Sequence, residues 1–232
     1  RGLLARRQLK SEVLLVRIAG GMRVGYRDVY EVDGRKIQDR SQRVRNLFLS
    51  GTDESALALG RIATESARFN LGQMQRTTNL PTLPMLYLVP AMHPRLYFSR
   101  GGDEEMDGTK TTVLEFREDA SPTLAATAAG IDMPARGRAW VEPDTGRIRR
   151  IELRFAAGAR RVMTVWFRDD PRVEFLPPAR MWEWYERIPV GDVLPAGNLK
   201  GGWSADVEAL ATYTDLRLFS VETSEDIGAP PD

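Results

Sequence analysis

Two runs between residues 150 and 167 alternate their side chains with a period of two, and this pattern limits the fold more than any other feature of the sequence. Successive side chains of a β-strand point to opposite faces of the sheet, so such runs predict strands with one buried and one wetter face. The turn sequence at 143–146 and the link at 156–159 are too short to carry a crossover between parallel strands. Consecutive strands are therefore expected to pair as antiparallel meanders. The alternating residues are Ile151, Leu153 and Phe155 against Arg150, Glu152 and Arg154, and Met163, Val165 and Phe167 against Val162, Thr164 and Trp166.

An N-terminal hairpin is predicted before this main sheet. Residues 12–18 read as a buried strand, and the run Val24–Val32 leads to Asp33-Gly34, a dipeptide that favours a two-residue hairpin turn. Further strands are predicted near 95–99, 110–117, 136–142, 147–155, 160–168, 180–187 and 207–222.

Helical segments at about 41–92 are expected between the hairpin and the main sheet. A short helix can begin after Ser41, and a longer one, with apolar residues at helical spacing, can begin after Thr52 or Asp53. The longest uncharged stretch, Thr77–Pro94, contains four prolines. These prolines would break a membrane-spanning helix, so no transmembrane segment is predicted.

Composition fits one domain that spans 1–232. The chain has 232 residues, no cysteine, and 33 lysine and arginine residues against 32 aspartate and glutamate residues. The resulting net charge of +1 gives no basis for a nucleic-acid partner. Because the chain begins at Arg1 rather than Met, we expect any signal peptide to lie outside this sequence. The tail at 226–232 is expected to fray.

Patterns for catalysis and metal binding are sparse. The one histidine, His93, has no cysteine or second histidine with which to form a transition-metal site. The sequence contains no signature of a Ser–His–Asp triad, no nucleophile elbow and no phosphate-binding glycine pattern. We therefore expect no catalytic residue, no metal ligand, no cofactor and no enzymatic activity.

Two groups of acidic residues have alternative interpretations. The run at 103–107 could bind calcium, but it lacks the spacing of an EF-hand, and a solvated hairpin loop is the favoured interpretation. Glu183 and Glu186 could form a glycosidase pair. On one strand, however, they point to opposite faces and do not converge.

Four tryptophans fall on predicted strands of the main sheet. Trp182 and Trp184 share one face of the strand at 180–187, while Trp140 and Trp166 lie on neighbouring strands. The simpler interpretation is a core or sheet-face cluster, because aromatic cross-strand pairs stabilise ordinary sheets. The functional alternative is the lining of a cavity for an apolar ligand.

The proline-bounded apolar segment before the main sheet also has two interpretations. It can plug the concave face of a sheet, or it can act as a movable lid over a groove. With the four tryptophans, its apolar residues form the predicted ligand-binding set. They are Leu83, Met85, Leu86, Leu88 and Val89.

The order of motifs in the second half of the chain suggests a family. A strand, an Asp-x-Gly turn and a strand occupy 137–155, and Thr164–Phe167, Pro178–Glu183 and a closing Tyr-Thr-Asp-Leu at 213–216 follow. This order resembles that of bacterial envelope proteins of the lipoprotein-carrier (LolA/LolB-like) type. The segments at 27–34 and 67–72 are similar to those of uncharacterised bacterial proteins of the same general shape.

The resemblance implies an α+β, mostly antiparallel fold: a strongly curved sheet, or incomplete barrel, with helices covering its concave face. Carriers of this type hold acyl chains in that hollow. We therefore expect a non-enzymatic, periplasmic or otherwise extracytoplasmic module that binds an apolar, acyl or lipid-type ligand between sheet and helices. The alternative is a structural or protein-interaction domain of a bacterial envelope complex, with a filled core and a protein partner.

Overall fold

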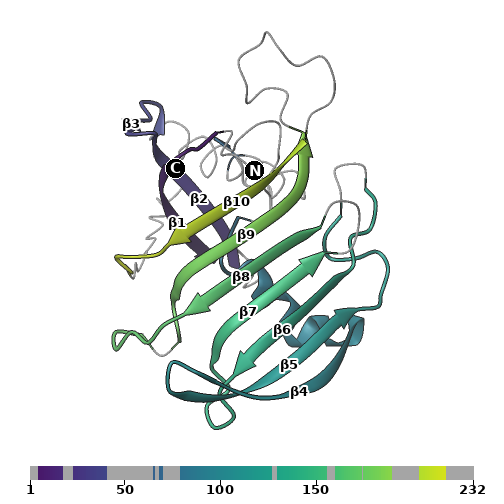
Figure 1. Cartoon of the computed structure of the whole chain (residues 1–232). Helices are drawn as coiled ribbons and strands as arrows, with labels where there is room; N and C mark the ends of the chain where they lie inside the picture. The colour runs from purple at the N-terminus through teal and green to yellow at the C-terminus, as the bar shows by residue number, and fades with distance from the viewer. Residues whose placement is uncertain are drawn as a thin grey trace, which may run out of the picture.

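The described residues form two antiparallel sheets and two short 3-10 helices (Figure 1). The computed structural model describes residues 5–17, 23–40, 65, 68–69, 79–126, 130–155, 160–173, 175–189 and 204–217.

The smaller sheet is the N-terminal hairpin. Strand β1 (Leu9–Arg17) pairs with β2 (Arg23–Val32), and β3 (Arg35–Lys36) returns along β2. Asp33 and Gly34 have φ values of 48° and 80°, as a two-residue hairpin turn requires of both central residues. The predicted hairpin at this dipeptide is confirmed.

The larger sheet has seven strands in sequence order, each antiparallel to its neighbours. Because every strand pairs with the next strand of the chain, the prediction of antiparallel meanders is confirmed. The strands are β4 (Leu96–Met106), β5 (Thr109–Glu118), β6 (Ala135–Val141), β7 (Ile148–Phe155), β8 (Arg161–Phe167), β9 (Pro178–Pro189) and β10 (Ser204–Thr212).

The predicted incomplete barrel is wrong. The large sheet is open, with β4 at one end and β10 at the other, and it is neither closed nor strongly curled (Figure 1). It therefore has no concave face for helices to cover. A physical reason lies in the side chains, because inner-face side chains converge when a sheet curls. Here Phe116 and Phe155 project from one face, and Trp140 and Trp166 project from the other.

The core lies on the face of the large sheet that packs against the 3-10 helices η2 (Leu83–Leu88) and η3 (Pro90–Arg95). Tyr87 of η2 is 2% exposed, and its ring stacks on that of Phe116 with 6.0 Å between centroids. Burial, together with the charge of Glu118, raises the pKa of Tyr87 above its ordinary value, so the ring packs as a neutral group. The buried cluster comprises Tyr87, Phe116, Met133, Ala135, Ala139, Ile151, Leu153, Phe155, Met163, Val165 and Met181.

At the C-terminal end of the helical region expected at about 41–92, the proline-bounded segment forms the short 3-10 helices η2 and η3. Leu83, Met85 and Leu88 pack against the buried cluster, whereas Leu86 and Val89 are exposed. The short helix predicted after Ser41 and the longer one predicted after Thr52 or Asp53 fall outside the described residues, apart from isolated positions.

Gly137 of β6 provides a test of this packing. A Cβ atom at this position would lie 2.1 Å from Cζ of Phe116, whose ring covers the glycine. We expect Gly137→Ala to lower the free energy of unfolding by about 1–3 kcal/mol, because overpacking forces the ring or the backbone to shift. Denaturant unfolding measures the change.

Gly101→Ala is the matched control in the same sheet. Its added Cβ would meet the flexible Glu115 side chain at 3.1 Å, at an exposed position of β4. Equal stabilities of the two variants would contradict the proposed ring–glycine packing.

Candidate functional site

The antiparallel register arranges the outer face of the large sheet, opposite the buried cluster, into rows of side chains. Arg117, Arg136 and Arg154 lie directly opposite one another on β5, β6 and β7. We call these three residues the arginine row. Tyr97 of β4 continues the row beside Arg117, and the Arg117 guanidinium carbon lies 4.4 Å from the centroid of its ring.

The next row alternates in charge. Glu115, Arg138 and Glu152 are directly opposite on β5, β6 and β7, with Ser99 beside Glu115 on β4. Arg138 lies 3.5 Å from a carboxylate oxygen of Glu115 and donates a hydrogen bond of 3.1 Å to Glu104. We call Ser99, Glu115, Arg138 and Glu152 the mixed row.

A third row stacks tryptophan against arginine. Trp140, Arg150, Trp166 and Arg180 are opposite one another on β6 to β9. The guanidinium carbon of Arg150 lies 4.2 Å from the Trp140 centroid and 5.4 Å from the Trp166 centroid, and Arg180 stacks on Trp166 at 4.1 Å. Cation–π contacts of this kind stabilise the face. The guanidinium carbon of Arg138 lies 4.9 Å from the Trp140 centroid, so Arg138 and Arg150 both cover Trp140, which is only 1% exposed.

Near β10 the same face carries an apolar group that is partly exposed. Trp182 and Trp184 lie on β9, and Leu210 lies opposite Trp182 on β10. The indole of Trp182 donates a hydrogen bond of 2.5 Å to Glu208, while Leu210 is 68% exposed. We call Trp182, Trp184 and Leu210 the edge patch, because β10 is the last strand of the sheet among the described residues.

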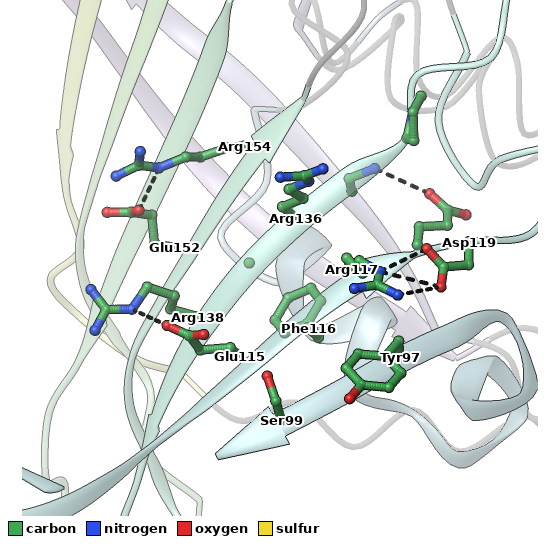
Figure 2. A pocket seen from close by; sticks show the side chains of 14 residues that line it. Tyr97, Ser99, Glu115, Phe116, Arg117, Asp119, Arg136, Arg138, Glu152 and Arg154 are labelled. Atoms are coloured by element: carbon green, nitrogen blue, oxygen red, sulfur yellow. Dashed lines mark hydrogen bonds and ion pairs between the residues drawn. The ribbon is translucent and has the colours of Figure 1, made fainter. Parts of the chain in front are cut away.

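A groove of about 740 Å³ runs over the arginine row and the mixed row, across β4 to β7 (Figure 2). Three of its four guanidinium groups are held by carboxylates. Arg117 is paired with Asp119 at 2.9 Å, Arg154 with Glu152 at 2.7 Å, and Arg138 with the glutamates described above. The groove is therefore a charged surface of fixed ion pairs, with the Arg136 side chain in its centre (Figure 2).

Two carboxyl groups of this face, Asp119 and Glu104, have a pKa below the ordinary value. The hydrogen bonds from Arg117 hold the pKa of Asp119 below its ordinary value, with smaller contributions from the charges of Arg117 and Arg136. The indole of Trp140 donates a hydrogen bond of 2.7 Å to Glu104. This hydrogen bond is the largest cause of the lowered pKa of Glu104.

The predicted ligand-binding residues are not brought together. Leu83, Met85 and Leu88 contact the buried cluster on the core face, and Leu86 and Val89 are the exposed members of that segment. The four tryptophans Trp140, Trp166, Trp182 and Trp184 lie on the outer face, because they alternate along their strands with core residues such as Ala139, Val165 and Met181.

The three remaining candidates from the sequence, His93, Glu183 and Glu186, each contact other residues of the chain. Nε2 of His93 lies 3.2 Å from the carbonyl oxygen of Leu88. The His93 ring meets the Phe98 ring edge-on, with 5.3 Å between the ring centroids. Glu183 is buried and accepts a hydrogen bond from Tyr185, whereas Glu186 is paired with Arg160 at 3.1 Å.

The acidic run at 103–107 lies mainly on β4, and its turn is formed by Asp107 and Gly108. Within the described part of the chain, no group of three or more histidine, aspartate or glutamate residues is arranged to hold a metal ion. Among the described residues, none of the helices has the length and hydrophobicity of a membrane-spanning segment.

Sequence reasoning missed the arginine row and the groove. The alternation along β7 already places Arg150 and Arg154 opposite the apolar residues, but it contains no information on which residues of β5 and β6 lie beside them. Only the hydrogen-bonded register supplies those neighbours.

Comparison of the chain with models of known protein families, with curated proteins and with solved structures gives no match. The interpretation of the outer face therefore rests on its own geometry.

The Trp140–Glu104 hydrogen bond gives a pH-dependent prediction. Because the folded pKa of Glu104 is lowered from its ordinary 4.5, the stabilisation is present at neutral pH and is lost as the pH falls through the lowered folded value. We expect the Trp140 indole N–H resonance to titrate with a midpoint below 4.5 in a two-dimensional NMR spectrum.

Glu104→Gln should abolish that titration and leave the Trp182 indole resonance unchanged, because Trp182 is bonded to Glu208 instead. A Trp140 resonance that titrates identically in this variant would contradict the assignment.

Proposed function

We propose that this chain is a non-enzymatic protein-interaction domain of a bacterial envelope complex, with a filled core and a binding surface on the outer face of its large sheet. The observation that carries the proposal is the contrast between the two faces. The core face is packed by η2, with Tyr87 stacked on Phe116, while the outer face carries the edge patch, with Leu210 exposed and both tryptophans half-buried. Exposed apolar groups with a polar surround are typical of protein interaction sites.

The chemistry around the edge patch favours a protein partner with both apolar and acidic side chains. Leu210 and the half-buried Trp184 offer apolar contact area, the Arg160 guanidinium lies over Trp184, and Arg180 stacks on the neighbouring Trp166. Tryptophan and arginine are the side chains that most often dominate protein interfaces. Arginine also selects carboxylates by its planar, forked geometry.

Substitution of the edge patch tests this function. We expect Leu210→Ser, alone or with Trp182→Ser, to weaken a stoichiometric complex with the natural partner at least about tenfold, because contacts at an interface centre dominate affinity. The dissociation constant is measured on the purified complex, and its stoichiometry by native mass spectrometry.

Phe175→Ser is the control, since Phe175 is also exposed but lies outside the large sheet's strands. Unaltered affinity of the edge-patch variants, or equal weakening by Phe175→Ser, would overturn the choice of surface.

The acyl ligand expected from the sequence between sheet and helices is untested and is not part of this proposal. The side chains expected to line its site lie on opposite faces of the sheet, and Leu83, Met85 and Leu88 of η2 already contact the buried cluster. We expect native mass spectrometry and solvent extraction of the purified protein to give the mass of the polypeptide without a stoichiometric lipid. A bound acyl lipid would contradict the filled core.

The envelope location is proposed only from the order of sequence motifs, because the half-barrel fold of lipoprotein carriers is not found here. A fusion of the complete natural reading frame to alkaline phosphatase should be active, because that enzyme folds only where its disulfides form. An inactive, stable fusion would place the domain inside the cell and remove the envelope from the proposal.

A further inference from the structure

The arginine row places three like charges side by side on adjacent strands. Arg117 is directly opposite Arg136, and Arg136 is directly opposite Arg154. Like charges in this cross-strand arrangement destabilise a sheet. The row is therefore unfavourable for folding unless each charge is compensated.

Two of the three charges are compensated within the chain. Asp119 accepts hydrogen bonds from Nε and Nη2 of Arg117, at 2.9 to 3.3 Å, through both of its oxygens. Glu152 accepts a hydrogen bond of 2.7 Å from Nε of Arg154.

Arg136 is not compensated in this way. It is exposed and makes no hydrogen bond or ion pair with any described residue, and in Figure 2 it lies between the two neighbouring pairs. The nearby carboxylates have other partners, because Arg117 occupies Asp119, and the backbone N–H groups of Leu124 and Ala135 occupy Glu118. The central guanidinium is thus available to an external anion.

We propose that the groove binds an acidic segment of the partner protein and that Arg136 anchors one of its carboxylates. A carboxylate matches the planar guanidinium fork with two parallel hydrogen bonds. The groove, at about 740 Å³, has room for several side chains, and its Ser99 hydroxyl lies in the adjacent mixed row. Glu115, Glu152 and Asp119 in the same lining repel a densely charged polyanion, which favours a peptide with spaced acidic residues over a nucleic acid.

This inference rests on the proposed function only for the source of the carboxylate, so it can be tested without the partner. The probe is a fluorescent peptide of alternating glutamate and serine, and its glutamine–serine counterpart is the uncharged control. We expect the acidic peptide alone to bind, with an affinity that falls as salt is added. Arg136→Gln should weaken it roughly tenfold, the effect of removing one charged hydrogen-bonding partner.

Arg35→Gln is the matched control variant. Arg35 is also an exposed arginine, but it lies on β3, away from the groove. The Arg35→Gln variant should therefore bind the peptide as the parent protein does. Equal binding by the Arg136 and Arg35 variants, or equal binding of the uncharged peptide, would overturn the proposal. So would binding of inorganic phosphate at Arg136 in place of the peptide.

Thermal unfolding separates recognition from a structural role. Because Arg136→Gln relieves like-charge repulsion, its midpoint temperature should equal or exceed that of the parent. A lowered midpoint would mean that Arg136 supports the fold, and it would overturn the assignment.

The two proposals also fail separately. Leu210→Ser should leave binding of the acidic peptide unchanged. If the acidic peptide does not bind but partner affinity still depends on the edge patch, only the groove inference is overturned. If the acidic peptide binds but partner affinity does not depend on the edge patch, only the proposed function is overturned.

Discussion

The hydrogen-bonded register of β5, β6 and β7 is the constraint on which the rest of this structure depends. It places Gly137 opposite Phe116, so that the ring can cover the glycine and stack on Tyr87. The same register places Arg136 between Arg117 and Arg154 on the other face. A shift of one residue would exchange the two faces, so core and surface are specified together.

The two faces of the large sheet are stabilised in different ways. The core face is closed by η2, whose tyrosine is buried as a neutral ring among aromatic and aliphatic side chains. The outer face is stabilised by cation–π stacking and by ion pairs that fix most of its arginines. Because individual exposed ion pairs contribute little stability, their main effect is to orient charge over the groove.

Much of the sheet could be predicted from local patterns, and its curvature could not. The turn at Asp33-Gly34, the meander order and the short helical turns near Leu83 follow from residue types within a few positions. Curling depends on how seven strands twist together and on the bulk of side chains on both faces. The resemblance to half-barrel carriers therefore suggested a concave face that the open sheet does not have.

The sequence by itself determined which side chains share a strand face, because the period of two follows from backbone geometry. It thus separated Trp182 and Trp184 from Met181 and Tyr185. Only the tertiary structure decided which face packs against η2 and which residues become neighbours across strands. Those relations arise from pairing between segments distant along the chain, and for that reason the arginine row and its groove became visible only in the folded protein.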